Sequence, residues 1–372
     1  MAAGARFHAM DEARDMARRN LPAMIFDYVD GTAGSGYSER ANREALHAIR
    51  LRQRALCNVE TRSIASSLFG RETGLPFSIA PMGFCNTVKP GADLLLAAFA
   101  ARHRVPVCVS TAATTPLEKM IERAQGNAWF QLYYTRDQEA GEELVRRAEV
   151  SGYDTLVLTV DVPEVGRRPR ELRHGFQLPF AMTPGQWIDS ALHPRWSLAM
   201  AAGGMPRLAN FDGSLAKFDR SASRAGADWE YLSRLRDRWK GKLVVKGVLD
   251  SEDALRIRQA GADAIQISSH GGRQMDSAPL PVHALTTIRE AVGATYPLFF
   301  DSGVRTGEDI VKLHALGADF VFIGRPFLYA IAAAGKAGPD IAADILSKEI
   351  SITLAMIGRT GMSGLDREVL AD

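Results

Sequence analysis

The feature that most constrains the fold is a regular alternation of short apolar runs and helical stretches, which begins near residue 75. Runs of this length are too short for buried helices and are typical of strands that are covered on both faces. Helical patterns such as Ser251–Gln259 and Thr306–Leu316 separate them. Strands that alternate with helices form a parallel sheet, and eight such units predict a closed (β/α)₈ TIM barrel of the α/β class. The eight predicted strands are Phe77–Ala80, Val105–Ser110, Trp129–Tyr133, Thr155–Thr159, Leu243–Lys246, Ala264–Ser268, Leu298–Asp301 and Phe320–Ile323.

A repeated junction favours the barrel over a doubly wound sheet. Ser151–Asp154 precedes the fourth predicted strand, Ala260–Asp263 the sixth and Leu316–Asp319 the eighth, and each has a glycine at its second position. A glycine there can take the left-handed conformation that closes a helix and turns the chain into the next strand.

The chain is predicted to be a single domain over residues 1–372, with additions before and within the barrel of residues 75–365. Residues 1–74 are predicted to be an N-terminal helical segment, since Asp11–Asn20 and Ala23–Val29 have helical patterns and residues 1–60 as a whole favour helix. Gly31 follows as a helix-ending signal. In this segment Tyr28 is either a core residue or a phenol that points into a pocket from outside the barrel.

Composition excludes several classes of function. The net charge of +2 over 372 residues gives no sign of a nucleic-acid partner. The cysteines, Cys57, Cys85 and Cys108, are odd in number and have no metal-binding spacing, so neither a disulfide framework nor a metal site is predicted. The charged N-terminus is unlike a secretory signal, and no apolar run is long enough to span a membrane. We therefore expect a cytoplasmic protein.

The interval between the fourth and fifth predicted strands is much longer than an ordinary crossover, and residues 177–225 are predicted to be a lid or insertion. Residues 184–210 within it combine tryptophan, leucine and methionine with Arg195 and Arg207, which suggests a peripheral contact with the inner face of a membrane. His193-Pro194 and Gly203-Gly204 interrupt any long amphipathic helix there.

The stretch Ile265–Asp276, IQISSHGGRQMD, is where we expect the chemistry. A buried strand ends in Ser268-Ser269 and is followed at once by His270, two glycines and Arg273. Histidine can take a proton near neutral pH, and arginine can hold a carboxylate or phosphate through two parallel hydrogen bonds. The glycines allow the backbone to turn sharply and to approach a bound ring.

The carboxyl ends of barrel strands face the active site, and nearly all of the predicted ends carry polar residues or glycine. The ends after strands seven and eight, Asp301–Arg305 and Ile323–Pro326, predict a phosphate site, because barrels commonly bind phosphate at that position. A phosphate site beside a His/Arg centre indicates a nucleotide-like cofactor. Since no G-x-G-x-x-G motif opens a βαβ unit, a nicotinamide cofactor is not favoured.

From Leu21 to Leu365 the chain resembles the FMN-dependent L-2-hydroxy-acid oxidase/dehydrogenase family. The resemblance is carried by the segments LPAMIFDYVDGTAG, WFQLYYTRD, LTVDVP, LVVKGVLDSEDA, SSHGGRQMD, FDSGVRTGEDIVK and VFIGRPFLYA. It implies the fold predicted above, FMN as cofactor, a small 2-hydroxy acid as substrate, and quinone, another acceptor or oxygen as the oxidant. The family's tetramers imply a homotetramer.

The resemblance also implies the roles of individual residues. His270 is the base, with Asp161 to orient it, stabilise its protonated form and raise its pKa. Arg168 and Arg273 hold the substrate carboxylate, and Tyr28 and Tyr133 hydrogen-bond to the substrate. The residues expected to bind FMN are Ala80, Met82, Ser110, Gln131, Thr159, Lys246, Ser268, Asp301, Gly303, Arg305, Gly324 and Arg325. Among these, Lys246 is expected to face the edge of the flavin where negative charge accumulates on reduction.

Three departures from the family pattern carry further expectations. Ser269 replaces the usual asparagine before the histidine, which alters the positioning of that loop. Ala112 stands where glycolate oxidases have tryptophan and predicts substrates bulkier than glycolate. Gly83 replaces an alanine and favours an acceptor other than oxygen.

Two alternatives stay open at this point. One is an FMN-barrel enzyme for another substrate class, either an isomerase or an oxidase of a peptide-derived precursor. The other is a non-catalytic flavin-binding or interaction protein.

Overall fold

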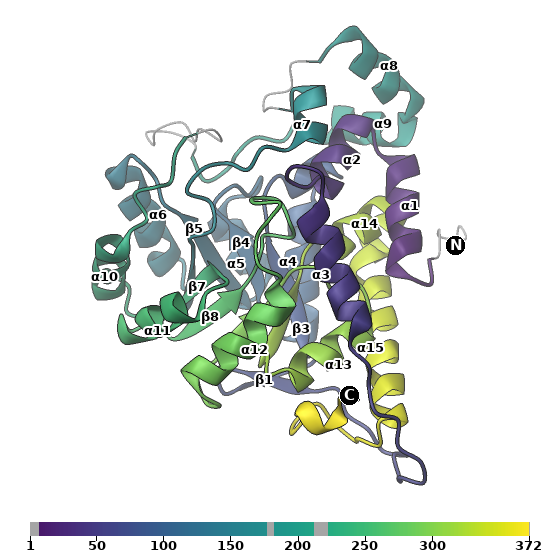
Figure 1. Cartoon of the computed structure of the whole chain (residues 1–372). Helices are drawn as coiled ribbons and strands as arrows, with labels where there is room; N and C mark the ends of the chain where they lie inside the picture. The colour runs from purple at the N-terminus through teal and green to yellow at the C-terminus, as the bar shows by residue number, and fades with distance from the viewer. Residues whose placement is uncertain (1–6, 177–181, 212–221, 372) are drawn as a thin grey trace.

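The protein is a parallel eight-stranded barrel surrounded by helices (Figure 1), seen in a computed structural model that describes residues 7–176, 182–211 and 222–371. The strands close in the order β10-β3-β4-β5-β6-β7-β8-β9, and every neighbouring pair is parallel. This confirms the (β/α)₈ barrel. The barrel strands are β3 (Phe77–Met82), β4 (Val107–Ser110), β5 (Ala128–Tyr133), β6 (Thr155–Thr159), β7 (Lys242–Val248), β8 (Ala264–Ile267), β9 (Leu298–Phe300) and β10 (Phe320–Ile323).

The strands are nearly uniformly apolar because they are buried on both sides, by the barrel interior and by the outer helices. The outer helices in the described residues are α4 (Ala92–His103), α5 (Leu117–Arg123), α6 (Gln138–Val150), α10 (Trp229–Arg238), α11 (Ser251–Gln259), α12 (Pro281–Val292), α13 (Gly307–Ala315), α14 (Arg325–Ala334) and α15 (Gly338–Met356). Short 3₁₀ turns are η1 (Cys85–Thr87), η2 (Gly335–Ala337) and η3 (Arg367–Val369). The predicted helix-to-strand glycines Gly152, Gly261 and Gly317 all have positive φ, as expected for the left-handed turn.

The N-terminal segment is helical only as far as Ala48, so the expectation of helix throughout residues 1–60 was too broad. It contains α1 (Met10–Asn20), α2 (Ala23–Asp30) and α3 (Tyr37–Ala48). Gly31, which ends α2, is extended (φ −64°) and not left-handed. α1 packs along α14, burying the small face formed by Met10, Ala13 and Ala17.

An antiparallel hairpin of β1 (Ser66–Leu68) and β2 (Arg71–Thr73) precedes the barrel and was not predicted. At its turn Phe69 packs edge-on against Phe299, with ring centroids 5.3 Å apart, and also contacts Trp129. The hairpin thus packs on aromatic residues of the barrel, although its own polar sequence gives little strand signal.

The long interval after β6 contains α7 (Pro169–His174), α8 (Pro184–Leu192) and α9 (Pro194–Gly203) before α10. The break between α8 and α9 falls at His193, as the sequence indicated. These helices gather with α2 at one end of the molecule (Figure 1). Residues 177–181 and 212–221 of the predicted insertion lie outside the described residues.

Candidate active site

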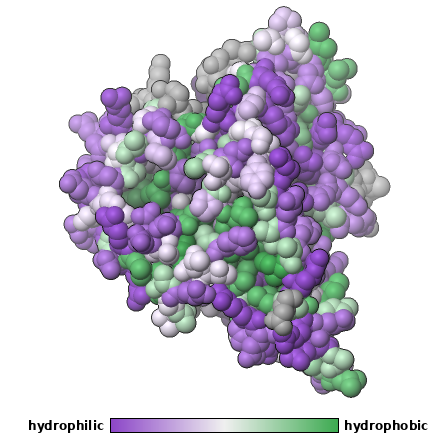
Figure 2. All heavy atoms as spheres, viewed as in Figure 1, coloured by the Kyte–Doolittle hydropathy of each residue, from purple (hydrophilic) through white to green (hydrophobic). Residues whose placement is uncertain are grey.

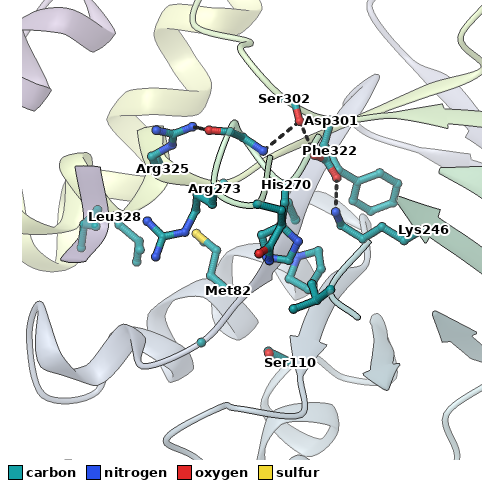
Figure 3. Close-up of a pocket in the computed structure, with 18 of the residues that line it drawn as sticks. Met82, Ser110, Lys246, His270, Arg273, Asp301, Ser302, Phe322, Arg325 and Leu328 are labelled. Atoms are coloured by element: carbon teal, nitrogen blue, oxygen red, sulfur yellow. Dashed lines mark hydrogen bonds and ion pairs between the residues drawn. The ribbon is translucent and has the colours of Figure 1, made fainter. Parts of the chain in front are cut away.

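One pocket at the carboxyl end of the barrel brings together most of the predicted site residues. Its lining includes Tyr28, Ala80, Met82, Ser110, Tyr133, Arg168, Lys246, His270, Arg273, Asp301, Gly303, Arg305, Gly324 and Arg325. The other four, Gln131, Thr159, Asp161 and Ser268, are not part of the lining but contact or pair with residues that are. Figure 3 shows Lys246, His270, Arg273 and Arg325 around this single cavity.

Strand register places the polar strand ends side by side. Ser110 is paired with Gln131, and Tyr133 with Thr159. Thr159 is in turn paired with Lys246 on the next strand. The polar side chains therefore lie at two successive levels near the mouth of the barrel. Ser110 and Gln131 share one level, and Tyr133, Thr159 and Lys246 share the next.

The loop after β8 turns back on itself, because His270, Gly271 and Gly272 all have positive φ (56°, 66° and 72°). A Cβ on Gly272 would lie 2.9 Å from the backbone N of Glu39, so only glycine allows this close approach. Ser302 fixes the loop, since its Oγ accepts hydrogen bonds from the backbone N–H groups of Ser269 (3.1 Å) and Gly271 (3.0 Å). Sequence reasoning placed Ser302 in the predicted phosphate-binding segment Asp301–Arg305 and did not assign it this role.

The imidazole of His270 lies between a carboxylate and a phenol. Its Nδ1 is 3.1 Å from Oδ1 of Asp161, and its Nε2 is 3.5 Å from the hydroxyl of Tyr133. Burial would raise the pKa of Asp161, but its interaction with His270 and the charge of Lys246 lower the pKa below its ordinary value. Asp161 is therefore a carboxylate at neutral pH, which fixes the Nδ1–H tautomer and directs the Nε2 lone pair toward the pocket.

The pKa of His270 is lowered, whereas the sequence predicted a raised value. Burial is the largest cause, because it disfavours the charged imidazolium. The positive charges of Lys246 and Arg168 act in the same direction. Together they outweigh the effect of Asp161, so His270 is neutral at pH 7 and ready to accept a proton.

Both predicted arginines are anchored from behind by Glu171, a buried residue of α7 that sequence reasoning missed. Arg273 Nη2 is 2.6 Å from Glu171 Oε1, and Arg168 Nη1 is 3.5 Å from the same oxygen. The other terminal nitrogen of Arg273 donates to the carbonyls of Tyr28 (2.8 Å) and Gly31 (2.7 Å). The spacing of Arg168 and Glu171, three residues apart across the start of a helix, was the available signal.

Tyr28 lies on α2 and lines the pocket from outside the barrel. Its hydroxyl donates to the carbonyl of Gly83 (3.2 Å), and its ring stacks on Phe176 with centroids 4.3 Å apart. For Tyr133, burial and the charge of Asp161 raise the pKa, so this phenol keeps its proton and can donate a hydrogen bond.

Arg224 is a third arginine of the pocket and was also missed. It is buried, and its guanidinium carbon lies 5.0 Å from the centroid of the Tyr133 ring. It belongs to the insertion, where the sequence shows no periodicity that would place a side chain.

Lys246, Ser268 and Asp301 form a buried chain of hydrogen bonds beneath the pocket. Lys246 Nζ donates to Ser268 Oγ (2.6 Å) and lies 3.0 Å from Asp301 Oδ2, while Ser268 Oγ donates to Asp301 Oδ1 (2.6 Å). Burial would lower the pKa of Lys246, but the charges of Asp301 and Asp161 raise it. A fixed positive charge is therefore held at the base of the pocket.

Comparison with known proteins identifies the family. A family model described as FMN-dependent dehydrogenase matches residues 17–372. The chain belongs to the FMN-dependent dehydrogenase family. (S)-Mandelate dehydrogenase of Pseudomonas putida is 38% identical over 368 residues, which cover 97% of this chain and 93% of that protein.

Solved structures of relatives have the same architecture as this FMN-dependent dehydrogenase. A crystal structure of the monotopic membrane protein (S)-mandelate dehydrogenase superimposes with a TM-score of 0.91 at 37% identity, covering 98% of this chain and 99% of the other. A mandelate oxidase superimposes with a TM-score of 0.84 at 33% identity, with 98% of each chain covered. These findings confirm the predicted FMN-dependent enzyme of the 2-hydroxy-acid dehydrogenase and oxidase class, and they favour neither alternative.

The pocket of this FMN-dependent dehydrogenase fits its cofactor. Two buried polar atoms at the mouth of the barrel, Gln131 Nε2 and Thr159 Oγ1, have no hydrogen-bond partner within the described residues. Such atoms are rare in folded proteins unless a ligand pairs with them. Ser110 accounts for the orientation of Gln131, because its hydroxyl donates to Gln131 Oε1 (3.0 Å) and leaves the amide nitrogen free.

At the other end of the pocket, Arg305 and Arg325 suit a phosphate. Arg305 is buried, and both burial and the nearby charge of Arg325 lower its pKa. Two like charges held together in this way are relieved by a bound anion. Arg325 also donates to the carbonyl of Gly271, which links the phosphate end to the histidine loop.

A metal site is not seen in the part of the chain that the structure describes, where no group of three or more His, Cys, Asp or Glu side chains is arranged to hold an ion. Among the same residues, none of the helices combines the length and the apolar character needed to span a bilayer.

Proposed function

We propose that this enzyme oxidises L-2-hydroxy acids with a bulky, in particular aromatic, side chain to the corresponding 2-oxo acids. The observation that carries the proposal is the meeting of a neutral, carboxylate-backed His270 with Arg168 and Arg273 in one pocket. The small residues Gly83 and Ala112 leave room for a large substituent in the wall of that pocket. (S)-Mandelate, the substrate named in the relatives, is the first compound to test.

Oxidation of the substrate removes two electrons and two protons, and bound FMN supplies the electron acceptor. His270 takes one proton at Nε2, since Nδ1 is committed to Asp161. The negative charge of Asp161 then stabilises the imidazolium that forms, in a site where burial would otherwise disfavour it. The same base serves hydride and carbanion routes alike, because either route needs one proton to leave the substrate.

Arg168 and Arg273 hold the substrate carboxylate and so orient the α-carbon toward His270. Tyr133 donates a hydrogen bond to the substrate from beside His270. The hydroxyl of Tyr28, which donates its proton to the carbonyl of Gly83, hydrogen-bonds to the substrate from α2 as an acceptor. Their rigid supports, namely Glu171, backbone carbonyls and stacked aromatic rings, reduce the entropy lost when the substrate is aligned.

The residues proposed to hold FMN form two groups, one at each end of the pocket. Ala80, Met82 and Ser110 would lie beside the ring system, and Gln131 and Thr159 would offer it their unpaired polar atoms. Lys246, positioned by Ser268 and Asp301, provides positive charge where the reduced ring becomes negative. Toward the other end, a group of glycines and arginines is proposed to hold the ribityl chain and the phosphate: Gly303, Arg305, Gly324 and Arg325.

The decisive experiment is anaerobic reduction of the FMN-loaded enzyme by a panel of 2-hydroxy acids that includes (S)-mandelate, (R)-mandelate, L-lactate and glycolate. We expect (S)-mandelate to bleach the flavin absorbance fastest. The variant His270→Gln should keep its flavin and slow bleaching by about two to four orders of magnitude. Flavin that no 2-hydroxy acid bleaches, or unchanged bleaching in His270→Gln, would contradict the proposal.

We propose further that the enzyme is a peripheral protein at the inner face of the membrane and passes electrons to a quinone. The support is a set of exposed apolar side chains on α8 and α9, namely Trp187, Ile188, Leu192 and Leu198, between 64% and 74% exposed. The structural relative described as a monotopic membrane protein adds to it. In this arrangement α8 and α9 of the insertion contact the membrane, Arg224 of the same insertion forms part of the active-site wall, and the enzyme is a homotetramer.

Vesicle co-sedimentation tests the membrane contact. Replacement of Trp187, Ile188 and Leu192 by serine should release the enzyme from vesicles and leave its activity with a soluble dye acceptor intact. Binding that survives these changes would place the contact elsewhere. Analytical ultracentrifugation tests the tetramer, and steady-state reduction of a short-chain quinone analogue tests the acceptor.

A further inference from the structure

A second pocket, separate from the active site, lies where α9 begins. It has a volume of about 410 Å³ and is formed by the end of α1, the loop before α4, the start of α9 and the end of α14. Arg19, Lys89 and Arg195 are among its lining residues, together with His193. The residues that line it include no aspartate or glutamate, so the pocket collects positive charge without a matching negative group.

These cations contrast with the neighbouring arginines. Next to this pocket, Arg14 is paired with Asp30 (2.6 Å), and Arg170 is paired with both Asp27 and Asp30. In the described part of the chain, Arg19, Lys89 and Arg195 form no ion pair; Arg19 only donates from Nε to the carbonyl of Asp15 (3.3 Å).

The nearby carboxylate of Asp189 is engaged already. Its Oδ2 accepts from the backbone N–H of Ala23 (2.7 Å), and its Oδ1 lies 3.4 Å from Nδ1 of His193. The charge of this pocket is thus available to an external anion.

The walls of the pocket are held in place. Trp196, buried at the start of α9, donates from its indole nitrogen to the carbonyl of Thr87 (2.8 Å). Asn20 donates to the carbonyl of Ala332 (3.0 Å) and so ties the end of α1 to α14. A pocket braced in this way is preorganised for a ligand.

The position of the pocket indicates where its ligand comes from. Leu192 lines the pocket and is 74% exposed, and Trp187 and Ile188 lie earlier on the same helix, each 64% exposed. Figure 2 shows apolar residues gathered at the outer end of α8, at the top right of the molecule. The cations therefore lie beside the surface that we propose to contact a membrane, where anionic lipid headgroups can reach them.

We propose that this pocket binds the phosphate of an anionic phospholipid, such as phosphatidylglycerol, while the apolar end of α8 enters the lipid. The proposal rests on the membrane contact described above. A phosphate oxygen is a strong acceptor for guanidinium and ammonium groups, and the adjacent apolar side chains suit the acyl chains below the headgroup. The pocket thus adds a preference for lipid type to a contact that apolar side chains alone would make with any bilayer.

The test compares vesicle binding of the FMN-loaded enzyme and two triple variants. The first variant, the pocket variant, combines Arg19→Gln, Lys89→Gln and Arg195→Gln. The second variant is the matched control and combines Lys119→Gln, Arg123→Gln and Lys348→Gln. These three cations of α5 and α15 are exposed and form no ion pair within the described residues. Both variants lose the same charge and should keep wild-type activity with a soluble dye.

Three kinds of vesicle are compared. They consist of phosphatidylcholine alone, of phosphatidylcholine with one-third phosphatidylglycerol, and of phosphatidylcholine with oleate that supplies an equal negative charge.

We expect the wild-type enzyme to bind phosphatidylglycerol vesicles at least tenfold more tightly than neutral ones and more tightly than oleate vesicles, since each basic residue near an anionic surface contributes several-fold. The pocket variant should lose this preference and the control should keep it. An equal loss in both variants, or equal binding of oleate and phosphatidylglycerol vesicles, would mean diffuse charge attraction and overturn the site.

Two further outcomes are distinct. Wild-type enzyme that binds neutral and anionic vesicles equally would overturn the headgroup site and leave the membrane contact standing, whereas no binding to any vesicle would overturn both. A thermal shift with glycerol 1-phosphate identifies the source of the phosphate: stabilisation of the wild type but not the pocket variant at micromolar concentrations would indicate a soluble ligand and overturn the lipid assignment.

Discussion

Glu171 Oε1 lies 2.6 Å from Nη2 of Arg273, in a buried ion pair that also reaches Arg168 at 3.5 Å. One carboxylate thus balances the two guanidinium groups that are proposed to hold the substrate. Its charge repels the substrate carboxylate, yet its removal takes away the carboxylate that pairs with the partly buried Arg273. These opposing effects lead to a specific prediction.

Glu171→Gln should make the substrate-free enzyme less stable by about 3 kcal/mol, because loss of one partner leaves buried charge uncompensated. A bound carboxylate ligand then compensates the positive charge that Glu171 no longer neutralises. A saturating 2-oxo acid should accordingly raise the melting temperature of the variant more than that of the wild type, as measured by thermal denaturation. The control is Glu164→Gln, an exposed residue nearby in the chain. Equal stabilisation of variant and wild type by the ligand would contradict the role given to Glu171.

The pH dependence of the reaction depends on His270. Its pKa lies below the ordinary value of 6.5, mainly because of burial. The acid limb of kcat/KM, which reports the free enzyme, should therefore fall below pH 6.5. Asp161 raises this pKa, so Asp161→Asn should move the limb to still lower pH.

In the same variant kcat should fall at least a hundredfold, because the imidazolium formed in the reaction loses its counterion. Rate measurements from pH 4.5 to 8 with a saturating dye acceptor test both effects. A limb that moves to higher pH in Asp161→Asn would contradict the conclusion that Asp161 raises the pKa of His270.

Much of this site could be predicted from the sequence, for a physical reason. Barrel strands are covered on both faces, so they appear as apolar runs, and the polar residues that follow them must meet at one mouth. His270 and Arg273 come directly after such a run, and Lys246 ends another. The order and direction of the barrel strands were therefore enough to predict that these three side chains meet in one pocket.

The residues that were missed depend on contacts that leave no local pattern. Glu171 meets Arg273 across 102 residues, from a short helix that lies between β6 and the insertion. Arg224 reaches Tyr133 from the far end of the insertion of residues 177–225. The sign of the pKa shift of His270 was also out of reach, since a neighbouring carboxylate can be recognised in sequence but the extent of burial cannot.

Lys246 is expected to tune the flavin. Lys246→Met should lower the two-electron reduction potential by on the order of 50 mV, equivalent to about 2 kcal/mol, because a buried cation no longer favours the reduced ring. Spectroelectrochemical titration measures this directly. Lys242→Met, at the opposite end of the same strand, is the control and should leave the potential unchanged. A shift of equal size in both variants would argue against a local charge effect.

Gly83 is expected to influence the choice of electron acceptor. A Cβ at this position would lie 3.0 Å from Cβ of Ala112 and 3.7 Å from the hydroxyl of Tyr28, so Gly83→Ala must displace its neighbours slightly. We expect turnover with oxygen to rise several-fold relative to turnover with a quinone analogue. Gly185→Ala, where nothing lies within 4 Å of the added carbon, is the control. An unchanged ratio of the two activities would remove Gly83 as a determinant.

Ala112 is expected to set the size of the substrate. It is buried in the pocket wall beside Gly83, so Ala112→Leu adds three carbons to the space proposed for an aromatic substituent. We expect kcat/KM for (S)-mandelate to fall about a hundredfold and that for L-lactate to change less than threefold, because steric exclusion acts only on the larger group. Ala112→Gly should preserve the preference for (S)-mandelate, and this variant separates loss of space from general disturbance of the strand end. A parallel loss with both substrates in Ala112→Leu would mean that the substituent occupies another part of the pocket.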